Sequence, residues 1–516
     1  MVLRADARGG VVRASLLIAA AALGCATKLP DDDRVPLRDG ASVRNVAPMA
    51  GARVQSRRPR VRWRTDPTAR PVVLEFCRDR ACASVITSAV RAGGAGGPDI
   101  DLPYGPVFWR VRDPTRAGEG SVSPAWWLSV PRGARGAERE TLSWRTKTAV
   151  DADGDGRDDV VAPDGYVRTG PARGASLGRA GLVYEGGDVD GDGFPELVLS
   201  IARGGRESGE VLVYRAPLRE DGNEPAWRLT LGEPGDLFGA GVASGDFNGD
   251  GFGDLAVGAP GLAQRRGAVL VYPGSPRGLL TTLPVRVESP FGLGGGFNAL
   301  AAGDLDRDGR DDLLAGASYA AFGLPGVAVV YAGPSLAEAS PLWTARRASD
   351  GFATVGVLGD VTGDGVTDAV LNALSDRGFG CLRAFDGGAA RRGVEGDVGA
   401  VCASPTQGIQ ALRSFLAMGD FNGDGALDVA AEVYDVLGNA SPMVIMMGGW
   451  SRVAEPRQVS LPQAPADPQR TDVPVSGDFD GDGYADLVSF GFYRGVWRGL
   501  RYRGGAEGLT RAPDPL

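Results

Sequence analysis

Residues 246–254 read Asp-Phe-Asn-Gly-Asp-Gly-Phe-Gly-Asp, and the apolar segment Leu255-Ala256-Val257 follows at once. Oxygen-bearing side chains stand at positions one, three, five and nine of this nonapeptide, and glycine stands at position six. Alternate oxygens converge on one point where glycine permits a sharp turn, and the backbone carbonyl at position seven adds a further ligand. The segment therefore predicts a cation site in a loop that leads directly into a strand.

Six further segments repeat this pattern, so the chain carries seven acidic loops. They begin at Asp151, Asp188, Asp246, Asp304, Asp360, Asp420 and Asp478, which are 37, 58, 58, 56, 60 and 58 residues apart. The predicted ligands are Asp151, Asp153, Asp155, Asp159, Asp188, Asp190, Asp192, Glu196, Asp246, Asn248, Asp250, Asp254, Asp304, Asp306, Asp308, Asp312, Asp360, Thr362, Asp364, Asp368, Asp420, Asn422, Asp424, Asp428, Asp478, Asp480, Asp482 and Asp486.

Twenty-five of these 28 side chains are carboxylates, which repel one another unless a cation is bound. Calcium takes six to eight hard oxygen ligands, so we expect up to seven structural calcium ions. The start of the loop resembles an EF-hand, but the last acid comes at position nine instead of twelve. The alternative, a set of solvated Asp-Gly turns, needs no acid at position nine.

Short apolar segments surround each loop in a fourfold rhythm, as at 226–229, 241–245, 255–257 and 267–272. Four strands in about 58 residues is the size of a propeller blade, so we expect an all-β, seven-bladed β-propeller over residues 140–516. Because the first repeat is short, six blades and a remnant remain an alternative. The segment 140–145 is expected to complete the last blade and to close the ring.

Residues 46–131 differ from the repeats. Aromatic and β-branched residues alternate there with polar ones, which is typical of half-buried strands. The segment resembles a small fibronectin-III or immunoglobulin-like β-sandwich. Residues 132–139 are expected to form a linker to the propeller.

The N-terminus predicts export. Residues 1–24 combine early arginines with a short apolar segment, as in a signal peptide. Ala22-Leu23-Gly24-Cys25 resembles a bacterial lipoprotein box, although alanine stands where that family usually has leucine. The resemblance implies lipid on Cys25, a membrane tether over 25–45 and, because Ala26 follows, location in the outer membrane.

Four cysteines remain besides Cys25. Export permits disulfides, and proximity suggests the pairs Cys77–Cys82 and Cys381–Cys402.

One repeat carries a further signature. Phe238-Gly239 precedes its calcium loop and Gly258-Ala259-Pro260 follows, which resembles the FG-GAP repeat of integrin alpha propellers. The other repeats keep the loop while these flanking motifs erode. The resemblance implies calcium loops that stiffen one face of the ring and a ligand that binds on the opposite face.

The composition disfavours several classes of function. The chain has no histidine, a formal net charge of −9 and no basic footprint for nucleic acid. No nucleophile elbow is present. We therefore expect a binding or adhesion module for an extracellular protein or polysaccharide, and not an enzyme. The alternative is a calcium-assisted extracellular enzyme, similar to a polysaccharide lyase or a phospholipase.

Overall fold

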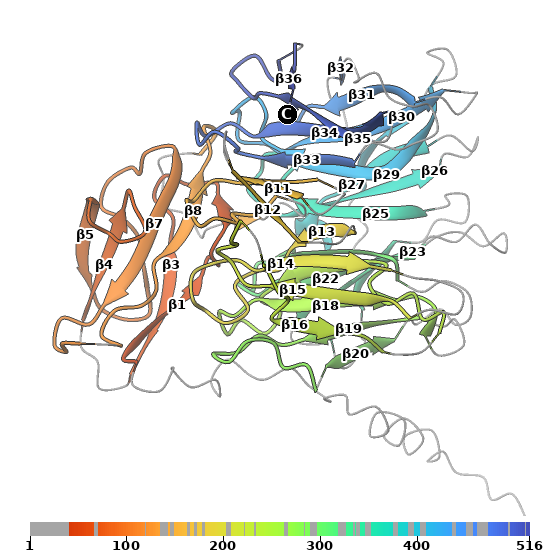
Figure 1. Ribbon diagram of the computed structural model, residues 1–516. Helices are drawn as coiled ribbons and strands as arrows, with labels where there is room; N and C mark the ends of the chain where they lie inside the picture. The colour runs from red at the N-terminus through yellow and green to blue at the C-terminus, as the bar shows by residue number, and fades with distance from the viewer. Residues whose placement is uncertain are drawn as a thin grey trace, which may run out of the picture.

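The computed structural model is an all-β molecule made of many small sheets (Figure 1). It describes residues 41–66, 71–118, 120–134, 143–144, 149–162, 166–169, 173–177, 181–202, 208–220, 222–231, 234–262, 267–282, 284–288, 297–317, 327–333, 336, 341–345, 352–374, 380–390, 397–402, 409–435, 440–449, 458–461, 473–493, 496–510 and 512–515. Within these ranges α3 (Gly387–Ala390) is a single helical turn. The predicted signal peptide, Cys25 and the tether up to residue 40 lie outside the described residues. The prediction that the tether extends to residue 45 is wrong, because residues 43–45 belong to the buried strand β1 (Val43–Ala47).

Two sheets form the N-terminal unit, which we define as residues 41–134. The first has the order β1-β3-β6 and the second β5-β4-β7-β8-β2-β9. Their strands are β1 (Val43–Ala47), β2 (Ala52–Val54), β3 (Val61–Thr65), β4 (Val72–Cys77), β5 (Val85–Arg91), β6 (Ala95–Gly96), β7 (Gly105–Arg112), β8 (Trp126–Val130) and, from beyond the unit, β9 (Ser143–Trp144). β2 runs parallel to β8, whereas the other pairs are antiparallel.

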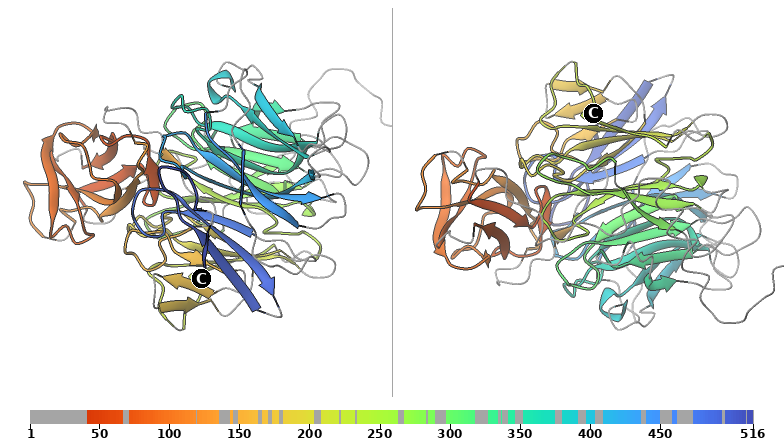
Figure 2. Two further views of the ribbon diagram at one scale, coloured as in Figure 1. Left: turned by 90° about the horizontal axis from the view of Figure 1, so that it is seen from above. Right: turned by 90° about the horizontal axis from the view of Figure 1, so that it is seen from below.

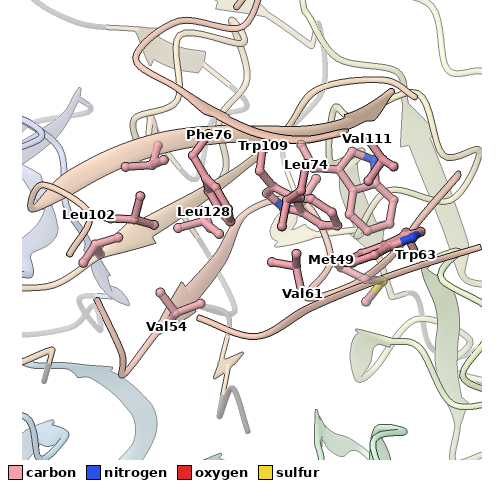
Figure 3. Packing of buried hydrophobic residues seen from close by; sticks show 14 of the residues in the cluster. Met49, Val54, Val61, Trp63, Leu74, Phe76, Leu102, Trp109, Val111 and Leu128 are labelled. Atoms are coloured by element: carbon pink, nitrogen blue, oxygen red, sulfur yellow. The ribbon is translucent and has the colours of Figure 1, made fainter. Parts of the chain in front are cut away.

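One apolar core joins the two sheets. Val61 and Trp63 of β3 pack with Leu74 of β4 and Trp109 of β7 (Figure 3). Trp109 and Trp126 meet edge to face, with ring centroids 5.9 Å apart. The alternation of apolar residues in these strands thus turns one side of each strand toward this core.

The remaining strands form one three-stranded and six four-stranded sheets, each in sequence order. The short sheet comprises β10 (Val160–Val161), β11 (Tyr166–Thr169) and β12 (Arg173–Ser176). The next three comprise β13 (Leu182–Glu185), β14 (Leu197–Ile201), β15 (Glu210–Tyr214) and β16 (Trp227–Leu229); β17 (Val242–Gly245), β18 (Asp254–Ala259), β19 (Ala268–Tyr272) and β20 (Val285–Glu288); and β21 (Ala299–Gly303), β22 (Asp312–Ala317), β23 (Val327–Tyr331) and β24 (Pro341–Ala345). The last three comprise β25 (Phe352–Gly359), β26 (Asp368–Leu374), β27 (Gly380–Phe385) and β28 (Asp397–Cys402); β29 (Ile409–Gly419), β30 (Asp428–Asp435), β31 (Ala440–Met446) and β32 (Gln458–Leu461); and β33 (Val473–Gly477), β34 (Asp486–Tyr493), β35 (Val496–Tyr502) and β36 (Asp514–Pro515).

Successive sheets lie side by side, and the first sheet lies beside the last (Figure 2). Buried apolar side chains pack between neighbouring sheets. Val160 and Ala162 of the first repeat share a cluster with Val488 and Phe490 of the last. The backbone N–H of Asp478 donates to Asp158 Oδ2 at 2.8 Å across the same junction. This arrangement is consistent with a β-propeller-like fold.

The structure differs from the sequence-based predictions at both ends of the repeat region. The first sheet has three strands, and the isolated bridge between Val150 and Asp159 stands where the other sheets have their first strand. The strands β10, β11, β12 and β13 still lie between the first and second loops, so the short spacing reflects short strands and connections. The prediction that 140–145 completes the last sheet is wrong, because Ser143–Trp144 pairs with β2 instead. β36 fills that place through Leu500 and Arg501.

Among the described residues, no helix has the length and apolar character needed to cross a membrane.

Candidate metal centre

Six of the seven acidic loops join the first strand of a four-stranded sheet to the second, and the first loop leads into β10. In the third repeat β17 ends at Gly245 and β18 begins at Asp254, so the loop occupies the turn between two antiparallel strands. The acid at position nine is the first residue of the second strand in five repeats, at Asp254, Asp312, Asp368, Asp428 and Asp486. Its side chain is therefore held by the sheet, whereas positions one to eight belong to the turn.

The same three hydrogen bonds shape all seven loops. The position-one carboxylate accepts from the N–H of the position-six glycine at 2.7–3.1 Å. The position-five carboxylate accepts from the N–H of position seven at 2.8–2.9 Å. The position-nine carboxylate accepts from the N–H of position two at 2.7–3.3 Å. These three hydrogen bonds thus fix the turn.

A second glycine in five of the repeats was missed by the sequence analysis. Its backbone N–H donates to the position-nine carboxylate at 2.6–3.3 Å. These anchor glycines are Gly274, Gly333, Gly387, Gly448 and Gly504. A Cβ on Gly387 would lie 1.9 Å from the Thr367 carbonyl, so a side chain does not fit there. The available signal was a glycine 18–21 residues after each acid, just beyond the third strand.

Acidic side chains converge in the four loops that carry Asp at position three. In the first loop Asp151, Asp153 and Asp159 each offer an oxygen within 4.8 Å of the others. The corresponding groups are Asp188, Asp190 and Asp192; Asp304, Asp306 and Asp308; and Asp478, Asp480 and Asp482. These four clusters could hold metal ions. The other three loops carry Asn248, Thr362 or Asn422 at position three, and their side chains hydrogen-bond to a loop carboxylate.

Burial gives these carboxylates unusual proton affinities. It raises the pKa of Asp159 to about 9, and that of Asp478 to about 8. Glu196 and Asp254 are fully enclosed, and burial together with neighbouring acids raises the pKa of both. In addition, Glu196 Oε1 and Asp246 Oδ1 are buried without a hydrogen-bond donor. Such oxygens are costly unless a proton or a cation neutralises them.

Arginine side chains already pair with acids of three loops: Arg80 with Asp151, Arg215 with Asp190, and Arg501 with two acids of the seventh loop. Arg501 Nη2 on β35 lies 2.7 Å from Asp480 Oδ2 and 2.6 Å from Asp486 Oδ2. These are positions three and nine of the seventh loop. Sequence reasoning did not connect Arg501 to the loop, although it lies 15 residues beyond Asp486 on the third strand.

The structure also places the predicted disulfides. Cys77 and Cys82 are bonded, with a Cα–Cα distance of 5.1 Å. Cys381 is disulfide-bonded and stands directly opposite Cys402 in the register of β27 and β28.

The fold and its repeated loops define an all-β repeat protein with candidate cation sites between strands. The family model of the FG-GAP repeat matches residues 238–272, which contain the third loop. Mouse integrin alpha-IIb is 35% identical over 160 residues, which cover 28% of this chain and 15% of the integrin. The chain therefore carries an FG-GAP repeat and is integrin-alpha-like in the matched region.

Human phosphatidylinositol-glycan-specific phospholipase D is 33% identical over 243 residues. The match covers 42% of this chain and 25% of the phospholipase, so the chain spans about a quarter of that relative's length. A solved rhamnogalacturonan lyase, YesW, aligns with a TM-score of 0.39 at 16% identity, covering 92% of this chain and 76% of the lyase.

The similarity to a phospholipase D corrects the prediction that this chain is not an enzyme, because it points toward an enzyme family. That prediction rested on the absence of histidine and of a nucleophile elbow. Histidine is one general base among several, however, and carboxylates with a raised pKa also transfer protons near neutral pH. The acidic loops contain such carboxylates.

Proposed function

We propose that this chain is a calcium-stabilised binding module. In this proposal the FG-GAP repeats form a seven-bladed β-propeller, preceded by a fibronectin-III or immunoglobulin-like sandwich. Calcium in the loops stiffens the ring, and the ring binds an extracellular protein or polysaccharide. The sequence placed a linker at 132–139 and the propeller from 140, but Ser143–Trp144 pairs with β2 of the N-terminal unit, so in this proposal the propeller begins after residue 144.

The donor set of the loops carries this proposal. All seven loops share one hydrogen-bonding pattern, and Glu196 Oε1 and Asp246 Oδ1 are buried without a donor. Carboxylate and carbonyl oxygens are the ligands that calcium prefers, while the absence of histidine and cysteine from the loops disfavours zinc. When bound, calcium supplies the positive charge that holds these acids together. The residues present therefore fit the ion.

Metal analysis and calorimetry test the calcium sites. We expect the purified protein to bind several calcium ions per chain and to unfold at a lower temperature in excess chelator. Asp250→Ala is expected to lower the stoichiometry by one. The matched control is Glu507→Gln, which removes an exposed charge outside the loops. An unchanged melting curve in chelator contradicts the proposal.

Screening identifies the ligand class. The protein without its first 40 residues would be applied to polysaccharide and protein arrays, with calcium or with chelator. We expect calcium-dependent retention on one class of ligand. Retention that is equal in chelator argues against a calcium-stabilised binding surface.

We also propose that lipid on Cys25 holds the module at the outer membrane. Mature protein is then expected to begin at Cys25 and to partition into detergent, while Cys25→Ser is expected to remain folded without lipid. A mature terminus elsewhere contradicts this anchor.

A calcium-assisted extracellular enzyme is a second candidate function, favoured by the similarity to phospholipase D. The test is release of a phosphatidylinositol-glycan-anchored protein from vesicles by the purified chain. Release that Asp254→Asn abolishes supports this candidate, and no release above heat-denatured protein contradicts it.

A further inference from the structure

The N-terminal unit covers the acidic loops of the repeats. The evidence comes first from the glycine at position six, which has positive φ in all seven loops. In the third loop a Cβ on Gly251 would lie 2.7 Å from Val46 Cα. The corresponding nearest atoms in other loops are Phe108 Cζ for Gly156, the Ala125 carbonyl for Gly193, Arg62 Nη1 for Gly309, the Gly133 carbonyl for Gly425 and Tyr104 Cβ for Gly483. The same turn position of six loops thus meets residues 46–133.

Hydrogen bonds from the N-terminal unit end on the outer carbonyl groups of the same turns. Arg80 donates to the carbonyl of Gly193 at 2.7 Å. Arg62 donates to that of Gly309 at 2.6 Å. These carbonyls belong to position six.

Two further loops receive donors in the same way. Arg132 donates to the position-five carbonyl of Asp482 at 2.8 Å, and its backbone N–H donates to the carbonyl of Gly483 at 2.8 Å. Arg44 donates to the carbonyl of Asp250 and stacks 4.5 Å from the ring centroid of Phe252. The acidic loops together form one face of the repeats, which we call the loop face. Arginine side chains of the N-terminal unit and the position-six glycines meet at several loops of this face.

The geometry of the turn links this contact to the interior of the loop. The carboxylate of Asp304 holds the N–H of Gly309 at 3.0 Å, and the carbonyl of the same Gly309 accepts from Arg62. Position six is thus fixed from both sides, by a predicted cation ligand and by the N-terminal unit. Without a cation the acids of the loop repel one another. The turn that orients the Gly309 carbonyl toward Arg62 is then less stable.

We propose that residues 41–134 are a cap that docks on the loop face when the loops hold cations. The inference rests on the proposed calcium function, since calcium is the ion that organises the turns. Coupling between two binding events is reciprocal, so the docked cap also raises the calcium affinity of the loops. The loop face is then an internal interface, and a ligand of the module binds elsewhere on the molecule.

Calcium titration of two arginine variants tests the coupling. Arg62→Gln removes the donor to Gly309, whereas Arg78→Gln changes an exposed arginine of the same unit. We expect Arg62→Gln to lower the apparent calcium affinity of at least one site by roughly 5-fold or more, a typical allosteric coupling. We expect Arg78→Gln to bind as the parent does. Equal affinity of the two variants overturns the cap, while absence of calcium binding in all three proteins overturns the calcium function itself.

Two glycine variants test the docking in calcium. Gly251→Ala and Gly249→Ala share the strain of positive φ in one loop, with φ of 85° and 76°. The added methyl meets the Val46 backbone in the first variant but the flexible Arg310 side chain in the second. By small-angle scattering we expect a larger radius of gyration for Gly251→Ala than for Gly249→Ala. Equal radii at full calcium loading overturn the proposal.

Discussion

Asp254→Asn separates the structural role of a loop acid from its role as a calcium ligand. Asp254 is fully buried, its Oδ2 accepts from Phe247 N–H at 3.0 Å, and its Oδ1 accepts from Gly274 N–H at 2.9 Å. Asparagine keeps one acceptor but turns an NH₂ group toward the other N–H. A buried donor left without a partner costs about 1–3 kcal/mol.

The loss of calcium adds to this cost only when calcium is present. A ligand at one hundred times its Kd stabilises the folded state by about 2.7 kcal/mol. We therefore expect Asp254→Asn to lower the free energy of unfolding by about 4–6 kcal/mol in saturating calcium, and by about 1–3 kcal/mol in chelator. Without calcium the substitution also removes a carboxylate whose pKa burial raises, which further reduces the cost.

Urea unfolding followed by tryptophan fluorescence measures both values. The matched control is Asp236→Asn, because Asp236 is equally buried and caps the N–H groups of Gly209 and Phe238 outside the acidic loops. Its destabilisation is expected to be the same with and without calcium. A calcium-independent effect of Asp254→Asn would refute the assignment of Asp254 as a ligand.

Three further predictions follow from the described residues. In chelator the melting temperature is expected to rise as the pH is lowered from 8 to 6. Burial raises the pKa of Asp478 from 3.8 to about 8, so in this range the folded protein binds a proton that the unfolded chain releases. A fall in melting temperature contradicts this prediction. Arg501→Gln is expected to raise the calcium affinity of the seventh loop, because Arg501 pairs with Asp480 and Asp486 there. Calorimetry against the parent protein measures this affinity. Unchanged binding argues against competition between Arg501 and calcium for these carboxylates. Peptide mapping without reduction is expected to find Cys381 linked to Cys402, and free thiols there contradict the pairing.

The period of the acidic loops was sufficient to predict the repeating sheets. Position-nine acids such as Asp312 precede apolar segments, and the structure starts the second strand there. The pattern is local, because turn and strand are set by neighbouring residues. The sequence also placed Cys77 and Cys82 in one disulfide, since they are only five positions apart.

Contacts between distant segments were beyond the reach of the sequence. The pairing of Ser143–Trp144 with β2 depends on the position of the N-terminal unit. A strand of two residues is too short for the sequence to indicate which strand it pairs with. Likewise, Arg62 and Gly309 are 247 residues apart, and nothing in an alternating strand shows which arginine will meet a carbonyl. Anchor glycines such as Gly274 were hidden because glycine is common throughout the chain.

The junction between the first and last repeats bears on how the chain folds after synthesis. Val160 and Ala162 pack against Val488 and Phe490, and the hydrogen bond between Asp158 and Asp478 spans 320 residues. Until the ribosome has made the final repeat, one side of the first sheet has no neighbour and stays open to water. Nascent chains with such exposed apolar edges tend to aggregate. A shortened protein that stops before residue 473 is therefore expected to depend on holding chaperones, even though six of its acidic loops are complete.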